Sequence, residues 1–176
     1  MVVASYILSF LICLSFSSIV LSEPCTCTYT ISVKTGTMQQ AGTDAVVSLK
    51  FSDLENPAVY IKDLENYGIM EFGHDYFEFD NLDFFSYTGR CFPKPVCYIE
   101  LSHDNSGKYP GWYVKYVDVR SSGGYSIRET KKHFAVNQWL AKDEPPYQLS
   151  TFRDLCPSYN ERKIDCGVES VVDATI

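Results

Sequence analysis

The sequence predicts an all-β protein, an antiparallel β-sandwich of about eight strands. The first observation is alternation: Tyr29, Ile31 and Val33 are separated by small polar residues, as in a strand with one buried face. The second is the spacing of turn residues, since short segments of this kind are separated by Gly, Pro, Asn and Asp. No amphipathic stretch is long enough to predict a helix. Short strands with frequent turns are typical of a sandwich or a barrel.

Each strand is justified by alternation or by β-branched and aromatic residues. Apolar and polar residues alternate from Ala45 to Phe51 and, over a shorter distance, from Val59 to Ile61. The turn Asp80-Asn81 divides two aromatic segments, and the turn His103–Gly107 precedes the strand that begins at Trp112. In chain order the predicted strands are Tyr29–Val33, Ala45–Phe51, Val59–Ile61, Tyr76–Phe79, Leu82–Tyr87, Val96–Ser102, Trp112–Val119 and His133–Leu140.

Residues 1–22 are predicted to be a secretory signal peptide. The segment is apolar and uncharged, and Val20 and Ser22 occupy the small-residue positions before a cut at Glu23. A membrane anchor is the alternative, but several serines interrupt the apolar run, which is marginal for a span of roughly 20 residues. We therefore expect a sandwich domain at 23–156, a polar tail at 157–176, and a location in the endoplasmic reticulum or outside the cell.

Six cysteines remain after the signal peptide, and in an oxidising compartment an even number predicts three disulfides. Zinc is the alternative, but the spacings fit no familiar zinc site and no histidine lies near the close pairs. Six cysteines allow 15 connectivities. We expect Cys91 to pair with Cys97 across a proline-rich loop, and Cys25 and Cys27 to pair with Cys156 and Cys166.

Charge and motifs exclude several functions. The net charge of −7 disfavours nucleic acid, because affinity for phosphates comes from Lys and Arg. The sequence contains no nucleophile elbow, no H-E-x-x-H zinc motif and no glycine-rich phosphate loop. With the cysteines paired, no thiolate nucleophile remains. We therefore expect a protein that is not an enzyme.

Four motifs in order resemble the PLAT domain, the β-sandwich shared by polycystins, lipoxygenases, animal lipases and a clostridial alpha-toxin. They are Thr35-Gly36 with Ala41–Asp44, Phe77–Asp83, His103–Val119 and Phe134–Leu140. Within the family, the cysteines and the single domain make the chain similar to small secreted plant proteins associated with stress responses and the endoplasmic reticulum. The resemblance implies a module that binds membrane lipid or a protein.

The resemblance also implies a calcium site. The matching positions are Gly42, Thr43, Asp44, Asp75 and Glu78. Hard oxygen donors on adjacent loops are what Ca²⁺ requires. The acidic residues that the family places before the Trp-Tyr strand are replaced by Pro-Gly, which leaves three carboxylates for at most one site. The alternative is that Asp44 and Glu78 cap turns and pair with Lys or Arg.

Two loop residues, Met38 and Tyr109, are the candidate contacts to a membrane or partner. Trp112 and Trp139 lie within predicted strands and are expected in the core. Two functions remain open. One is a non-catalytic secretory-pathway adaptor that binds lipid or protein, with Ca²⁺ as a modulator. The other is a secreted, disulfide-stabilised accessory or storage-like protein without lipid or calcium binding.

Overall fold

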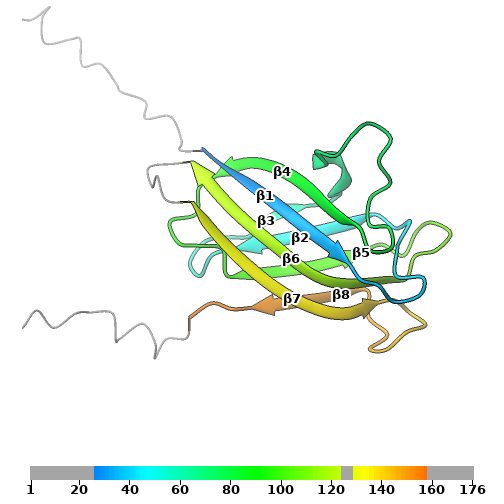
Figure 1. Ribbon diagram of the computed structural model, residues 1–176. Coiled ribbons are helices and arrows are strands. Elements are labelled where there is room, and N and C mark those ends of the chain that lie inside the picture. The colour runs from blue at the N-terminus through cyan, green and yellow to red at the C-terminus, as the bar shows by residue number, and fades with distance from the viewer. Residues whose placement is uncertain (1–25, 124–128, 158–176) are drawn as a thin grey trace, which may run out of the picture.

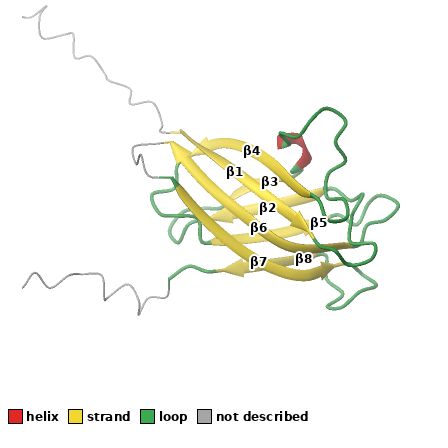
Figure 2. Ribbon diagram, in the orientation of Figure 1, coloured by secondary structure: helices red, strands yellow, loops and turns green. Residues whose placement is uncertain are grey.

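Two four-stranded antiparallel sheets pack face to face in the computed structural model, which describes residues 26–123 and 129–157 (Figures 1 and 2). Sheet A has the strand order β4-β1-β6-β7 and sheet B the order β3-β2-β5-β8. The predicted sandwich is confirmed. The strands are β1 (Thr26–Thr35), β2 (Val47–Ser52), β3 (Val59–Ile61), β4 (Leu82–Arg90), β5 (Tyr98–His103), β6 (Trp112–Gly123), β7 (Thr130–Leu140) and β8 (Ser150–Asp154).

The core lies between the sheets and is formed by the apolar residues of the alternating segments. Tyr29, Ile31 and Val33 of β1 are buried, as are Leu49 and Phe51 of β2. Because side chains of a strand alternate between its two faces, the intervening polar residues of β1 face away from the core. The described helical structure is one short 3-10 turn (Glu65–Tyr67), and no helix among the described residues is long and apolar enough to span a membrane.

The prediction of a strand at Tyr76–Phe79 is wrong. Phe77 has a backbone φ of +61°, which no strand residue adopts, and its side chain is fully buried. The buried Asp83 carboxylate accepts a hydrogen bond from the Phe77 N–H at 2.8 Å. The segment is therefore a turn that drives one aromatic ring into the core and leads directly into β4.

The eighth strand is β8, which sequence analysis did not predict. It pairs with β5 in the register Glu100↔Phe152. The residues of β8 that alternate with Phe152 are Thr151 and Arg153, and neither is apolar. Hydrophobic alternation is therefore missing from a strand that lies at the edge of its sheet.

The expected disulfide pairing is wrong. The disulfides are Cys27–Cys91 and Cys97–Cys156. Cys27 lies on β1 opposite the end of β4, and Cys91 is the first residue after β4. Likewise Cys97 precedes β5 and Cys156 follows its neighbour β8, where the Leu155 N–H donates to the Cys97 carbonyl at 2.8 Å. Each bond joins the ends of adjacent strands, one in each sheet. Cys25 and Cys166 lie outside the described residues.

Candidate functional site

Three connecting segments meet at one end of the sandwich, and we call residues 36–46, 75–81 and 104–111 together the loop end (Figure 1). Backbone hydrogen bonds join them: the Thr43 N–H donates to the Phe77 carbonyl at 3.3 Å, and the Asp44 N–H to the Tyr109 carbonyl at 3.2 Å. The buried Thr43 hydroxyl donates to the Pro110 carbonyl at 2.9 Å. The three segments therefore form one continuous surface.

Asp44 holds the turn of the third segment. Its Oδ2 accepts hydrogen bonds from the backbone N–H groups of Lys108, at 3.1 Å, and Tyr109, at 3.0 Å. Gly107 has a φ of +82°, and a Cβ there would lie 2.4 Å from the Asp44 Cβ. Glycine is thus required for this approach. The expected turn-capping role of Asp44 is present, whereas neither Asp44 nor Glu78 forms an ion pair within residues 26–123 and 129–157.

Glu78 and Asp44 line the same hollow, which has a volume of about 220 Å³. The hollow is lined by Gln40, Gly42, Asp44, Glu78, Phe79 and Tyr109. Burial raises the pKa of the Glu78 carboxyl, and the negative charges of Asp75 and Asp44 raise it further. A Cβ at position 42 would lie 3.0 Å from Glu78 Oε2, so Gly42 leaves the room that this carboxylate occupies. The hollow is therefore a place where negative charge is disfavoured unless a cation or proton joins it.

The predicted calcium ligands come together only in part. Asp44 and Glu78 line the hollow, whereas Asp75 does not and acts on Glu78 only through its charge. The Thr43 hydroxyl is engaged with the backbone of its own and the neighbouring segment. No group of three or more His, Cys, Asp or Glu side chains among the described residues is placed to hold a metal. The donor set near the hollow is thus two carboxylates and nearby backbone carbonyls, which suits a weak oxygen-ligated site at most.

Exposed apolar side chains lie on the loop end, and two of them, Phe79 and Tyr109, line the hollow. Met38 is 48% exposed, Phe79 52% and Tyr109 59%. Met38 and Tyr109 are where sequence analysis expected them, on the loops of this end. Phe79 was missed because its segment was taken for a strand, in which its ring would have been expected to pack. The signal that could have identified it is the Asp80-Asn81 turn beside it.

The two tryptophans differ in their environment. Trp112 is fully buried, as expected, and its Nε1–H donates to the Thr35 hydroxyl at 3.0 Å. Trp139 is only half-buried and packs edge-on against Tyr113, with ring centroids 5.5 Å apart. It lines a second hollow, of about 200 Å³, that also borders Tyr109. Trp139 thus extends the aromatic surface of the loop end instead of filling the core.

His74, beside the loop end, is paired with Asp83, and this pair supports the second segment of the loop end (residues 75–81). His74 Nε2 lies 2.6 Å from the Oδ1 of Asp83, whose other oxygen accepts from the Phe77 N–H. The hydrogen bond to Asp83 raises the pKa of His74. His103 does the same for the third segment, since its Nδ1 accepts from the Asn105 N–H at 3.2 Å. Burial lowers the pKa of His103.

Solved structures with the same fold include lipoxygenases. The coral 8R-lipoxygenase superposes with a TM-score of 0.53 at 18% identity, over 77% of this chain and 19% of that one. A calcium-dependent 11R-lipoxygenase superposes with a TM-score of 0.52 at 21% identity, over 73% of this chain and 17% of that one. At these identities the likeness shows the fold alone.

Sequence comparison is more specific. The family described as Embryo-specific protein 3 (ATS3) matches residues 15–143. PLAT domain-containing proteins 1 and 2 of Arabidopsis thaliana are 39% and 42% identical over 132 residues, which are 74% of this chain and 72% of each relative. The fold and the sequence identity to these relatives both agree with the PLAT motifs found in the sequence. The chain belongs to the family of PLAT domain-containing proteins.

Proposed function

We propose that the protein is a non-catalytic binding module that attaches to membrane lipid through its loop end, and that Ca²⁺ promotes the attachment. One observation carries the proposal: the exposed rings of Phe79 and Tyr109 line a hollow that contains Asp44 and Glu78, and Met38 is exposed on the same loop end. Binding at a lipid interface grows with the apolar area that enters it. Three such side chains on one end provide that area.

The carboxylates give the cation its role. Lipid phosphates repel Asp44 and Glu78, so bringing the loop end to a bilayer is unfavourable while both are ionised. A divalent cation held between them would remove that repulsion and would supply charge toward the phosphates. The coral 8R-lipoxygenase, whose fold is similar, is described as calcium-activated through a C2-like domain. That description supports a test for calcium in this chain.

The secretory pathway is the proposed location, either in the endoplasmic reticulum or outside the cell. The Cys27–Cys91 and Cys97–Cys156 disulfides support this, because such bonds persist in oxidising compartments. A role in the stress response of a plant is proposed from the resemblance to stress-associated PLAT proteins. Fractionation of cells that express the chain with a C-terminal tag tests the location, and recovery in the cytosol would contradict it.

Vesicle sedimentation tests the lipid proposal. The secreted chain is mixed with vesicles of phosphatidylcholine alone or with added phosphatidylserine, in millimolar Ca²⁺ or in chelator. We expect sedimentation with Ca²⁺ and its loss in chelator. Tyr109→Ala should weaken it several-fold, because that ring is exposed and its turn is held by backbone groups that alanine retains.

Phe152→Ala is the matched control, since Phe152 is 62% exposed but lies on β8 in sheet B. Its sedimentation should equal that of the unmodified chain. Absence of sedimentation on both vesicle types, with and without Ca²⁺, would contradict lipid attachment and favour an accessory or storage-like protein. Equal loss in Tyr109→Ala and Phe152→Ala would mean that the loop end is not the contact.

A further inference from the structure

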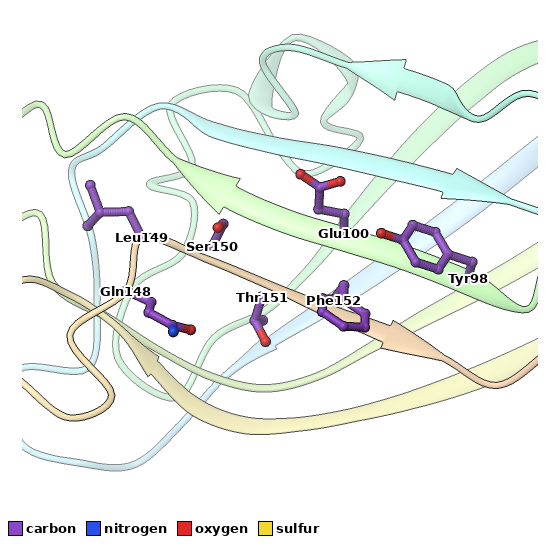
Figure 3. Close-up of a pocket in the computed structure, with 7 residues that line it drawn as sticks. All are labelled: Tyr98, Glu100, Gln148, Leu149, Ser150, Thr151 and Phe152. Atoms are coloured by element: carbon purple, nitrogen blue, oxygen red, sulfur yellow. The ribbon is translucent and has the colours of Figure 1, made fainter.

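A third hollow, of about 480 Å³, opens on the outer side of sheet B (Figure 3). It belongs to β5, to β8 and to the two residues that precede β8, and it shares no residue with the hollows of the loop end. Its size is within the range of small-molecule sites. It is lined by Tyr98, Glu100, Gln148, Leu149, Ser150, Thr151 and Phe152.

The hollow contains an aromatic platform. Tyr98 and Phe152 stack with ring centroids 6.2 Å apart and an interplanar angle of 21°, and Phe152 is largely open to solvent. Solvent-exposed stacked rings on the outer face of a sheet have no packing role in the core. They offer a flat apolar surface to a ligand.

Polar groups are available beside that platform. Among the described residues no intramolecular hydrogen bond engages the Gln148 amide, the Ser150 hydroxyl or the Tyr98 hydroxyl. Glu100 is already paired, because Lys50 Nζ lies 3.0 and 3.1 Å from its two oxygens. None of the seven described residues that line the hollow is basic. The hollow thus presents hydroxyls and an amide without an unpaired charge.

The same surface continues across the sheet. The pairings Lys50↔Tyr60, Lys50↔Glu100 and Glu100↔Phe152 place these four side chains in one row on the outer face. Lys50 Nζ lies 5.6 Å from the centroid of the exposed Tyr60 ring. Tyr60 and Phe152 are separated by three strand spacings, about 14 Å. The row therefore has an aromatic ring at each end, and the Lys50–Glu100 ion pair, whose charges neutralise each other, lies between the two rings.

We propose that this outer face of sheet B binds a neutral oligosaccharide. A pyranose ring has an apolar C–H face that stacks on an aromatic side chain, and hydroxyls at its edge that both donate and accept hydrogen bonds. The platform at Phe152 matches the first property, and the Lys50–Glu100 pair with Ser150 and Gln148 matches the second. An ionic ligand would meet no unpaired opposite charge among the lining residues, whereas a polyol would meet the hydrogen-bonding groups of Tyr98, Gln148 and Ser150 in the same hollow as the rings. The separation of Tyr60 from Phe152 calls for a chain of several sugars.

Calorimetry and amide NMR of the secreted full chain test the proposal. The probes are the hexaoses of β-linked glucose, xylose and mannose, together with a high-mannose glycan released from a glycoprotein. The two kinds of probe distinguish a polysaccharide backbone from a protein-attached glycan as the source. We expect one of them to bind and to shift the amide signals of β5 and β8.

Three variants locate the site. Phe152→Ala should weaken binding about tenfold, the effect of one lost stacking contact, and Phe152→Tyr should retain it. Tyr60→Ala should weaken a hexaose but leave a disaccharide unaffected. Tyr109→Ala, whose ring is 59% exposed at the loop end, is the matched control and should bind as the unmodified chain does.

The melting temperature of each variant is measured to verify that it is folded. No binding of any probe at millimolar concentration would overturn the proposal. So would equal binding by Phe152→Ala and the unmodified chain. Neither result bears on vesicle binding, because Phe152 is the control there and Tyr109 is the control here.

Discussion

At the scale of the residue, the Trp112 side chain connects three parts of the sandwich that are distant in sequence. Its indole packs edge-on against Phe77, with ring centroids 5.0 Å apart, and its N–H is bound by the buried Thr35 hydroxyl on β1. Phe77 reaches this contact only because of its unusual backbone conformation. One side chain thus connects β6, β1 and the second segment of the loop end.

Trp112→Ala should destabilise the fold by roughly 3–5 kcal/mol, because it removes a fully buried indole and leaves a cavity. Trp139→Ala is the control and should cost much less, since Trp139 is only partly buried. Urea denaturation followed by circular dichroism measures both. Similar losses for the two variants would mean that Trp139, and not only Trp112, supports the core.

His74 predicts a pH dependence with a definite sign. Its pKa is raised by the hydrogen bond to Asp83, so the folded state binds the proton more tightly than the unfolded state. The stability it contributes is complete below the unfolded pKa of about 6.5 and is lost as pH rises through the folded pKa. His74→Gln should therefore destabilise more at about pH 5.5 than at about pH 8.5.

Denaturation of both proteins at the two pH values measures this difference. His103 titrates with the opposite sign, because burial lowers its pKa, but it is present in both proteins and cancels. A His74→Gln effect that grows with pH would show that the proton is not held by Asp83.

At the scale of the element, Arg153 explains how the sandwich closes where β8 meets β7. Its Nε donates to the Ala135 carbonyl at 2.9 Å and its Nη2 to the Val136 carbonyl at 2.6 Å. β7 is an edge strand of sheet A, so one of its sides has no neighbouring strand in that sheet. One guanidinium thus covers part of an edge that could otherwise pair with another chain.

Arg153→Met should cost about 1–3 kcal/mol, because it keeps an apolar stem but removes the hydrogen bonds to those carbonyls. Arg120→Met is the control. Arg120 pairs with Glu129 at 2.7 Å, but both side chains are about half exposed, so its loss should cost less than about 1 kcal/mol. Chemical denaturation gives the two values, and light scattering reports any association through the exposed edge. Equal costs for both variants would refute the closing role of Arg153.

The strands that sequence analysis predicted are those whose inner faces are apolar. Apolar and polar residues alternate in β1 and β2, and in β6 on either side of its bulge, and the apolar set faces the core. β8 could not be found this way, since Arg153 and Thr151 alternate with Phe152, nor could the Phe77 turn, whose conformation depends on Asp83. The disulfide pairing was predicted wrongly because it depends on which strands are neighbours in each sheet, and alternation within one strand does not show this. The loop-end residues Asp44 and Glu78 were found through family motifs alone.

At the scale of the whole molecule, covalent and noncovalent organisation agree. Each described disulfide joins two adjacent strands of one sheet, and residues 91–97 connect the two bonded pairs across the sandwich. The loop end lies where β1 ends and β2 and β6 begin, whereas the disulfides lie at the opposite ends of their strands. The proposed binding surface and the described disulfides thus lie at opposite ends of the strands. This leaves the loops of the loop end to be ordered by hydrogen bonds instead of by cross-links.

We predict three disulfides and no free thiol in the chain without residues 1–22, the proposed signal peptide. Two disulfides are described, and Cys25 and Cys166 are the other two cysteines of that chain. Intact mass before and after alkylation, without reduction, decides the matter. A mass increase from alkylation would show a free thiol and contradict the third bond.

The loop end places the Asp44 and Glu78 carboxylates in one hollow beside the proposed lipid contact, so calcium should affect its stability. The pKa of Glu78 is raised, so the fold disfavours the ionised carboxylate, and at neutral pH this charge costs stability. Ca²⁺ that binds only the folded state should raise the melting temperature by mass action. Glu78→Gln should raise the melting temperature in chelator and diminish the calcium shift, since it removes both the penalty and a ligand. Glu55→Gln, at an exposed carboxylate between β2 and β3, should change neither value. Scanning calorimetry in chelator and in millimolar Ca²⁺ measures all three proteins. The unmodified chain could melt at the same temperature in both conditions while Glu78→Gln remains more stable. That result would mean that the Glu78 charge destabilises the fold but that no calcium binds in the hollow. Any attachment to lipid would then have to proceed without calcium.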